Sequence, residues 1–482
     1  MPTAAGDAVC LTRRGLKLPR AGDAVPPGDL ARTLQMLTVT PLAPEAGMGK
    51  APPAFKAYAE TQHAVYIPRF FDGVRLPAPA SEPAAQQQSR LQFCGSLRPA
   101  QANIVAAGLQ QCRQRGGGLL VLPTGFGKTV CALWIACALG VRTLVLAHKS
   151  FLLDQWAERI GAYVPQARIG RVQQNVVDVQ DKDIVLGMLQ SISKRDYDGS
   201  TFEGFGLTIV DECHHISAPV FSKAMFKTTS KYMLGLSATP DRKDGLGPSG
   251  ATPLLSWFLG PIISDQRGQG MPDDVVVRVV PYHCSAYDLP PPMMRGGMHI
   301  NLPKIITGMV QDEQRNQLLL SLLEEAVAAG RKVLCLSERR AHCQELLHMF
   351  NGSRRCNELQ KHASLYLGGM KPAELAAAAA SADVLMASYG LASEGLDIPT
   401  LDTLIMCTSR SSIEQSVGRV LRGAPNPLVV DVLDRFSVCF AQFNKRKAYY
   451  AKCGFSIRHQ GPAAAEQQGY AFVSDDDDDA VY

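Results

Sequence analysis

The segment LPTGFGKT, from Leu122 to Thr129, combines glycines with a lysine and a hydroxyl side chain. Gly125 and Gly127 allow the backbone to curl, so that successive N–H groups point at an anion where a helix begins. Lys128 would reach the terminal phosphates of a nucleotide, and Thr129 has the hydroxyl that such a loop places on Mg²⁺. Because the strict pattern begins with glycine where this chain has Leu122, a plain strand-to-helix turn with a surface lysine is the alternative interpretation.

Two adjacent carboxylates follow an apolar run in the segment LTIVDECHH. Asp211 could hold Mg²⁺, often through water, and Glu212 could polarise the water that attacks a γ-phosphate. The alternative is an acidic helix N-cap beside two core histidines. The glycine-rich loop, whose Lys128 lies 83 residues before Asp211, favours the catalytic interpretation.

Hydroxyl and guanidinium groups follow later apolar runs. Ser237 and Thr239, in LGLSATPDR, could relay a change at the phosphate to neighbouring loops, although alone they would indicate only a turn before a proline. Arg419 and Arg422 are three residues apart and would share one helical face. They could form a solvated stripe, or they could neutralise charge that develops on a transferred phosphoryl group.

These candidate residues follow two series of short apolar runs, each of which is closed by polar or glycine residues. The first series is Leu119–Leu122, Thr143–Ala147, Ile184–Gly187, Leu207–Val210 and Tyr232–Leu236. The second series is Val333–Leu336, Ser364–Leu367, Val384–Ala387, Thr403–Cys407 and Leu428–Val432. The spacing leaves room for crossover helices, which indicates two similar α/β units with buried parallel sheets. Ligands of such sheets bind outside the carboxyl ends of the strands, where these residues lie.

The composition along the chain predicts the domain boundaries. Residues 1–90 are rich in proline and alanine and are expected to form an accessory region and linker with little regular structure beyond short strands. The two α/β domains are expected at 91–270 and 304–460, joined by a connector at 271–303 that contains DLPPPMMRGG. Residues 461–482 are expected to be a disordered acidic tail.

The overall composition excludes several classes of protein. A chain of 482 residues with 46% hydrophobic content can form two or three globular domains, and no apolar run reaches the length of a membrane span. Thirteen cysteines occur without a C-x-x-C pair, which argues against zinc and against a disulfide framework. Without the five aspartates near the end of the chain, the formal net charge rises from +5 to +10, which suits a polyanionic partner. We expect a soluble intracellular protein with reduced thiols.

Taken together, the motifs resemble those of superfamily 2 helicases and translocases, in their order and over residues from about 91 to 455. RPAQ is similar to the adenine-reading element, PTGFGKT to motif I and AHKSFLLDQW to motif Ia. DECHH, SATP, GLASEGLDIP and QSVGRVLR are similar to motifs II, III, V and VI. The resemblance implies two tandem RecA-like domains, with parallel sheets covered by helices on both faces, and a small N-terminal region.

The resemblance also implies roles for individual residues, with ATP and Mg²⁺ as ligands. Phosphate and nucleotide contacts are expected from Arg98, Gln101, Pro123, Thr124, Gly125, Phe126, Gly127, Lys128, Thr129, Gly395 and Asp397. Gln101 would read adenine, Thr129 and Asp211 would hold the metal, and Glu212 would be the catalytic base. Arg419 and Arg422 would act as arginine fingers, while His215 and Gln415 would couple hydrolysis to closure, together with Ser237 and Thr239. Nucleic acid is expected to contact Lys149, Gln190, Ser337 and Ser388, although a lysine or serine after a strand is often only a cap.

Finer features point to one branch of the superfamily. DECHHISAPVF and QSVGRVLR are similar to the DNA-directed branch with the XPB-type helicases, and depart from the RNA-directed DEAD-box pattern. The chain also resembles helicases of large nucleocytoplasmic DNA viruses, including the poxvirus transcript-release helicase. This implies a DNA helicase or translocase for viral transcription or DNA repair, with transcription machinery as a possible partner and the virion or host-cell cytoplasm as its location. A duplex DNA translocase that does not unwind, and an RNA helicase, are the alternatives.

Overall fold

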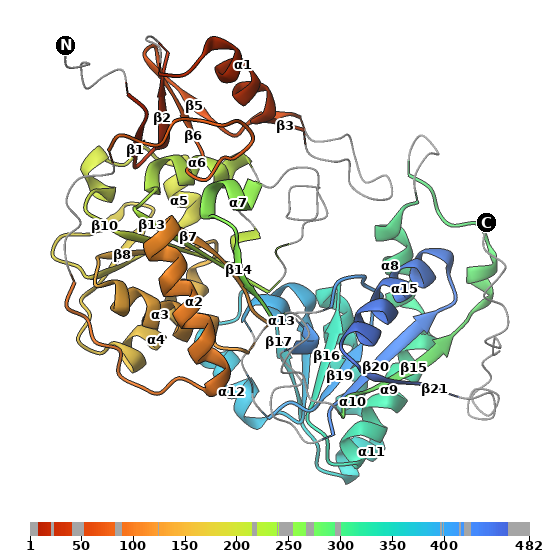
Figure 1. The fold of residues 1–482 in the computed structure, drawn as a ribbon. Helices are drawn as coiled ribbons and strands as arrows, with labels where there is room; N and C mark the ends of the chain where they lie inside the picture. The colour runs from red at the N-terminus through yellow and green to blue at the C-terminus, as the bar shows by residue number, and fades with distance from the viewer. Residues whose placement is uncertain are drawn as a thin grey trace, which may run out of the picture. The chain divides into compact units, whose positions relative to one another are not determined.

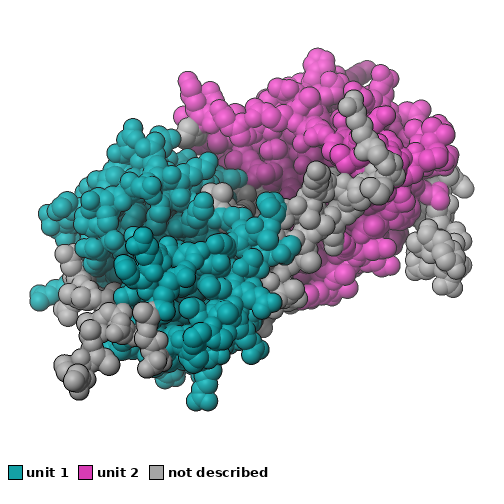
Figure 2. Space-filling model, turned by 90° about the horizontal axis from the view of Figure 1, so that it is seen from above, with its two compact units in different colours: residues 1–267 teal, residues 268–482 magenta. Residues whose placement is uncertain are grey.

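The computed structural model describes residues 8–20, 24–40, 53–81, 89–123, 125–214, 219–238, 240, 254–266, 274–294, 300–395, 398, 400–413, 416–418 and 426–460. The chain divides into two compact units, residues 1–267 and residues 268–482 (Figure 2). Each unit has its own parallel sheet and its own hydrophobic clusters. The fold predicted from the sequence, two RecA-like α/β units, is confirmed.

The first unit is built on an eight-stranded sheet with the order β10-β9-β11-β8-β12-β13-β7-β14. Its strands are β7 (Gly117–Val121), β8 (Thr143–Ala147), β9 (Ile169–Gln173), β10 (Val176–Asp178), β11 (Ile184–Met188), β12 (Leu207–Asp211), β13 (Tyr232–Ser237) and β14 (Ile262–Asp265). Every pairing is parallel except that of β10 with β9. The five central strands coincide with the five predicted apolar runs, because strands that are buried on both faces read as continuous apolar segments.

Helices cover both faces of this sheet (Figure 1). One face carries α2 (Pro99–Arg115), α3 (Lys128–Leu139) and α4 (Ser150–Tyr163), and the other carries α5 (Leu189–Lys194), α6 (Pro219–Thr228) and α7 (Leu254–Leu259). Alternate residues of each strand serve the two faces. Leu120 of β7 packs in the cluster beneath α2, α3 and α4, whereas Leu119 and Val121 pack beneath α5, α6 and α7.

The N-terminal region forms small antiparallel sheets and one helix. A four-stranded sheet has the order β1-β2-β6-β5, and a second sheet pairs β3 with β4. The elements are β1 (Cys10–Thr12), β2 (Gly15–Pro19), α1 (Pro27–Met36), β3 (Thr38–Val39), β4 (Phe55–Lys56), β5 (Ala59–Glu60) and β6 (Ala64–Ile67). The strands are as short as the sequence predicts. The prediction did not include α1, whose proline at the first helical turn is a favoured helix start.

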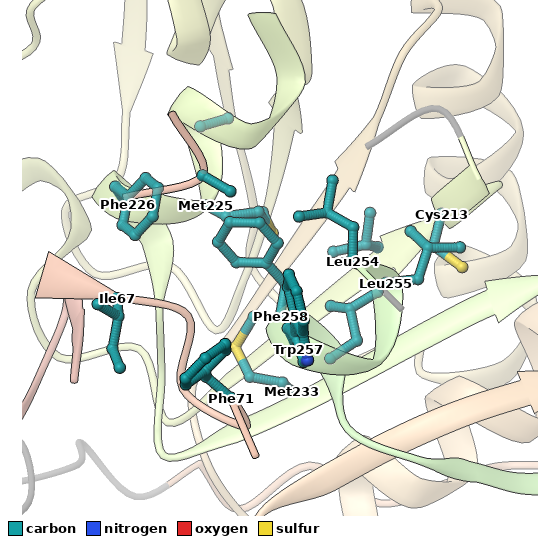
Figure 3. Packing of buried hydrophobic residues seen from close by; sticks show 14 of the residues in the cluster. Ile67, Phe71, Cys213, Met225, Phe226, Met233, Leu254, Leu255, Trp257 and Phe258 are labelled. Atoms are coloured by element: carbon teal, nitrogen blue, oxygen red, sulfur yellow. The ribbon is translucent and has the colours of Figure 1, made fainter. Parts of the chain in front are cut away.

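The N-terminal region shares a hydrophobic cluster with the first α/β sheet (Figure 3). The rings of Phe71 and Trp257 meet edge to face with centroids 5.1 Å apart. The Trp257 indole N–H donates to Asp72 Oδ1 at 3.1 Å, and the Phe70 N–H donates to the Trp257 carbonyl at 2.8 Å. Arg69 adds a bond of 2.7 Å from Nη1 to the Ser230 carbonyl. The N-terminal region is therefore part of the first unit's core.

The second unit contains a seven-stranded sheet with the order β17-β18-β16-β19-β20-β15-β21, in which every pairing is parallel. Its strands are β15 (Val276–Tyr282), β16 (Val333–Ser337), β17 (Ala363–Tyr366), β18 (Val384–Ser388), β19 (Thr403–Met406), β20 (Leu428–Asp434) and β21 (Ser456–His459). Its helices are α8 (Leu302–Gln311), α9 (Glu313–Ala328), α10 (Arg340–Gly352), α11 (Arg354–Glu358), α12 (Pro372–Ser381), α13 (Tyr389–Gly395) and α15 (Ser437–Lys452).

The segment 271–303 differs from the predicted connector. Its residues Val276–Tyr282 form β15, which lies between β20 and β21 in the sheet of the second unit. Val277 and Val279 are fully buried there. Most prolines and glycines of this segment lie after the strand, at residues 290–297, so the composition of the second half of the segment concealed the strand in its first half. The predicted tail, 461–482, lies outside the described residues.

Within the part of the chain that the structure describes, no helix is long and apolar enough to cross a membrane.

Replacing Trp257 with alanine tests the shared core. The change removes the ring that contacts Phe71 and the donor to Asp72, so it should lower the free energy of unfolding of the first unit by about 3–5 kcal/mol. Denaturant unfolding of the full chain measures this. Val176→Ala, at a side chain that is 52% exposed, is the control and should cost less than about 0.5 kcal/mol. Equal stability of the two variants would contradict the shared core.

Candidate active site

The carboxyl ends of three neighbouring strands bring the candidate residues together. In the first unit, β13 lies between β12 and β7. Ser237 is the register partner of Val121, and Leu236 is the partner of Asp211. The loop after β7, the serine at the end of β13 and the carboxylates at the end of β12 therefore meet at one edge of the sheet.

The loop after β7 has the backbone that its glycines predict. Gly125 and Gly127 have φ values of 87° and 88°, which a side chain with a Cβ rarely adopts. A Cβ on Gly127 would lie 2.6 Å from Gln101 Nε2, the end of a side chain, so the backbone conformation is the main requirement for glycine here. Helix α3 begins at Lys128, and the Phe126 N–H donates to the Pro123 carbonyl at 3.2 Å. The loop therefore ends at a helix N-terminus, where backbone N–H groups attract anions.

Lys128 and Thr129 occupy the first turn of α3, and both are partly exposed. Lys128 Nζ lies 3.5 Å from the Leu122 carbonyl oxygen and 3.8 Å from Glu212 Oε1. The ammonium group is thus held between the loop and the carboxylates. An anionic ligand at this helix start would lie within reach of it.

Gln101 ties helix α2 to this loop. It is only 3% exposed, and its Nε2 donates to the Phe126 carbonyl at 2.8 Å. Its Oε1 accepts a bond of 2.9 Å from the Arg98 N–H, which caps the helix. Arg98 also donates to the Phe126 carbonyl and lies over the Phe126 ring, 5.6 Å from its centroid. Both ends of the Gln101 amide are therefore engaged, and the predicted contact with adenine would use its second N–H or the second lone pair of its oxygen.

Asp211 is held in place by two donors. The Trp156 indole N–H donates to Asp211 Oδ2 at 2.9 Å, and the Glu212 N–H donates to Oδ1 at 3.0 Å. Burial, followed by the negative charge of Glu212, raises the pKa of Asp211. Trp156 and Lys128 act in the opposite direction. A divalent cation at this point would offset both the burial and the repulsion.

The residues present fit a magnesium ion. Each Asp211 oxygen keeps a lone pair beyond its single hydrogen bond, and a carboxylate with a threonine hydroxyl is the oxygen set that Mg²⁺ prefers. The described residues contain no cluster of three or more His, Cys, Asp or Glu side chains that could hold a metal. An ion bound at this point would be held by Asp211 and Thr129, with substrate phosphates and water completing its ligands.

Glu212 and Ser237 are linked through a histidine that the sequence analysis did not select. Glu212 has a φ of 46°, an uncommon value for a residue with a Cβ, and it follows β12 directly. His214 Nδ1 lies 3.5 Å from Glu212 Oε2 and 3.2 Å from Ser237 Oγ. The predicted coupling residue Ser237 therefore contacts the predicted base through His214. The sequence signal was present, because His214 is the first of the two histidines in DECHH.

Trp156 is the other functional residue that sequence reasoning missed. It lies on α4, is 2% exposed, and comes 55 residues before the carboxylate it contacts. Trp156 is the last residue of the segment AHKSFLLDQW, but a tryptophan at an apolar helix position ordinarily indicates core packing. Only the structure shows that its N–H reaches Asp211.

The residues predicted to contact nucleic acid lie in two pairs, one in each unit. In the first unit, Lys149 caps α4 after β8, and Gln190 lies in α5 after the neighbouring strand β11. The Gln190 amide donates to the His148 carbonyl, which links the two strand ends. Lys149 is partly exposed, with Nζ 5.9 Å from the centroid of the Phe151 ring.

In the second unit, Ser337 and Ser388 are register partners at the ends of β16 and β18. Ser337 is 1% exposed, lies 2.9 Å from His342 Nδ1, and accepts a bond of 3.1 Å from the Arg339 N–H. Burial lowers the pKa of His342 to about 3, so this histidine is neutral. The Ser337 hydroxyl is therefore buried and hydrogen-bonded within the second unit, and a nucleic acid would touch it only after a rearrangement. Ser388 is partly exposed.

Several predicted site residues lie outside the described residues: Thr124, His215, Thr239, Asp397, Gln415, Arg419 and Arg422. Gly395 is the last residue of α13. The roles of the two arginines, of His215 with Gln415, and of Asp397 at the nucleotide thus remain predictions from the sequence.

Comparison with known proteins indicates the family of this chain independently of the geometry of the site. Residues 95–242 match the family described as "Type III restriction enzyme, res subunit". A protein of Acanthamoeba polyphaga mimivirus, L396, which is assigned as an ATP-dependent RNA helicase, is 32% identical over 433 residues, covering 87% of this chain and 81% of that protein. QP509L of African swine fever virus (strain Badajoz 1971 Vero-adapted), with the same assignment, is 26% identical over 378 residues, covering 70% of this chain and 69% of that protein.

Among solved structures, a fragment of a protein assigned as the HsdR subunit of a type I restriction enzyme from Vibrio vulnificus YJ016 has the same fold. The TM-score is 0.55 at 17% sequence identity, and the match covers 76% of this chain and 69% of that chain.

Trp156→Phe tests the support of Asp211. The variant keeps a ring on α4 but removes the donor, so the carboxylate loses its fixed orientation. We expect the Mg²⁺ concentration for half-maximal hydrolysis to rise by about 10- to 100-fold. Titration of Mg²⁺ against binding of a fluorescent ATP analogue gives a readout that does not depend on turnover. Trp134→Phe, the same change on α3, is the control, and an unchanged Mg²⁺ requirement in Trp156→Phe would contradict the role.

Proposed function

The chain belongs to the superfamily 2 helicases, which hydrolyse ATP, and from this premise we propose that it is a motor that moves along DNA. The observation that carries the proposal is the meeting of the Lys128 loop, Asp211, Glu212 and Ser237 at one edge of a parallel sheet. An ATP-driven motor needs this combination, because a phosphate site must lie beside a base and beside a group that senses the phosphate.

Within this site we assign the following roles. The backbone of the loop and Lys128 bind the β- and γ-phosphates, and the helix start of α3 contributes its N–H groups. Thr129 and Asp211 hold Mg²⁺, which neutralises phosphate charge when it is bound. Glu212 accepts a proton from the attacking water, and Lys128 Nζ lies 3.8 Å from its Oε1. Arg419 and Arg422 of the second unit supply positive charge to the transferred phosphoryl group.

We propose that ATP hydrolysis is coupled to movement through the contacts of His214 with Glu212 and Ser237. Loss of the γ-phosphate changes the charge beside Glu212, and His214 passes this change to the end of β13. The second histidine of the motif, His215, together with Thr239 and Gln415, is proposed to extend the coupling. Each cycle would then shift the grip of the two units along a strand, mostly through backbone phosphates, so that binding is salt-sensitive and indifferent to sequence.

We propose DNA as the polymer on the basis of two motifs. DECHH and QSVGRVLR are similar to the DNA-directed, XPB-type branch and lack the features of the DEAD-box pattern. The viral relatives support an origin in a large DNA virus, and transcript release or DNA repair is the process that we propose. RNA is the second candidate, because L396 and QP509L are assigned as RNA helicases. Translocation on duplex DNA without unwinding is the third.

Lys128→Ala tests the catalytic assignment. The change removes the cation beside the phosphates and should reduce the rate of ATP hydrolysis by about a hundredfold or more. DNA binding, measured by fluorescence anisotropy with a labelled strand, should stay within about twofold of the unaltered protein because the loop does not contact the polymer. Equal turnover in this variant would exclude the proposed mechanism.

The choice of polymer is tested by ATP hydrolysis without polymer and with single-stranded DNA, duplex DNA or RNA. Strong stimulation by DNA and little by RNA is the expected result, with Lys128→Ala as the blank. A strand-displacement assay then separates a helicase from a translocase that does not unwind. Stimulation by RNA alone would overturn the assignment to DNA.

A further inference from the structure

The N-terminal sheet has one face turned toward the core and one turned away (Figure 1). The inward side chains are Leu11, Leu16, Leu18, Val65 and Ile67, each at most 7% exposed. We define the outer face by Thr12 of β1, Arg14 of the β1–β2 turn and Lys17 of β2, which are exposed or partly exposed, together with Tyr66 of β6. Tyr66 is partly buried and also packs against the hydrophobic cluster. Strand alternation separates the two sets, because successive side chains point to opposite faces.

Two cations flank one aromatic ring on the outer face. Arg14 lies over the Tyr66 ring with its guanidinium carbon 5.5 Å from the centroid. Lys17 is the register partner of Tyr66 on the adjacent strand, so their side chains stand side by side. Among the described residues, no carboxylate forms an ion pair with Arg14 or Lys17.

Other cationic side chains of the N-terminal region form ion pairs. Arg13, next in sequence to Arg14, pairs with Glu203 at 3.1 Å, and its carbonyl accepts a bond from the Thr229 N–H at 2.9 Å. Lys56 pairs with Glu60 at 2.7 Å, and Arg20 pairs with the same carboxylate. Arg13 thus fastens the sheet to the α/β part of the first unit, and Lys56 and Arg20 share the carboxylate of Glu60. Arg14 and Lys17 form no such ion pair among the described residues.

The backbone holds this arrangement rigidly. Gly15 has a φ of 92°, and a Cβ there would lie 2.2 Å from the Ile67 carbonyl oxygen. The close approach of β2 to β6 therefore requires glycine, and this approach sets Lys17 beside Tyr66. The region is also basic as a whole, because the described residues between 8 and 81 include eight lysines and arginines against three aspartates and glutamates.

We propose that the outer face is an accessory site for the sugar-phosphate backbone of the nucleic acid on which the motor moves, which rests on the proposed function. The guanidinium of Arg14 and the ammonium of Lys17 donate to phosphate oxygens, and the Tyr66 ring holds the guanidinium in place. Such contacts position a polymer without reading its sequence. The site lies outside the helicase motifs, so it adds grip and takes no part in hydrolysis.

The test uses the full chain with Arg14→Ala, Lys17→Ala and the double variant. Arg32→Ala removes the same charge from an exposed position on α1 and is the matched control. The dissociation constant for labelled DNA is measured over a range of salt concentrations. Each single variant should lower the salt slope by about 0.9, and the double variant by about 1.8, with affinity weakened by on the order of tenfold or more. Thermal unfolding checks that each variant is folded.

Hydrolysis separates this inference from the proposed function. At saturating DNA the double variant should hydrolyse ATP at the unaltered rate, while the DNA concentration for half-maximal stimulation rises. If the unaltered protein is stimulated by DNA and the double variant matches Arg32→Ala in affinity and salt slope, the accessory site is refuted and the motor stands. If no nucleic acid stimulates or binds the unaltered protein, the proposed function fails, and the inference fails with it.

Discussion

The parallel hydrogen bonding of β12, β13 and β7 is the constraint on which the site depends. The three strands are neighbours in space although β7 ends at Val121 and β12 and β13 begin only at Leu207 and Tyr232. Because their register brings Val121, Ser237 and Leu236–Asp211 to the same level, the loop, the serine and the carboxylates emerge together. A slip of one residue in this pairing would turn the side chains to the opposite face of the sheet.

Because Asp211 is buried, its ionisation depends on the groups that surround it. A carboxylate in this position is costly because burial and the charge of Glu212 both disfavour ionisation. The Trp156 N–H and the Glu212 N–H satisfy its oxygens without a metal, so the aspartate is oriented in advance. Helix α4 thus contributes a hydrogen-bond donor to the proposed ATP site, and this bond links the helix that begins after Lys149 to the proposed metal ligand.

The second unit relies on buried ion pairs for the same kind of orientation. Arg315 of α9 donates to both oxygens of Asp434 at 2.6 and 2.9 Å, and Arg446 of α15 donates to both oxygens of Asp431 at 2.8 Å. These four side chains are at most 1% exposed, and each pair joins a helix to β20. A pair of this kind is costly to break, since one charge would stay buried without its partner. Arg315 also donates to the Cys407 carbonyl and Arg446 to the Arg410 carbonyl, so both arginines bond to the chain that follows β19.

The sequence by itself determined the fold class and five strands of each parallel sheet, and it predicted the chemistry of the loop, Asp211 and Glu212. This was possible because buried parallel strands appear as continuous apolar runs and because glycine, lysine and carboxylate spacing is local. Only the tertiary structure decided which distant side chains meet: Trp156 with Asp211, His214 with Ser237, and Trp257 with Phe71. The buried Ser337, the engaged Gln101 and the incorporation of β15 into the second sheet were also decided there. The physical reason is that hydrogen bonds and packing between distant segments depend on strand order and helix placement, which the spacing of residues along the chain does not encode.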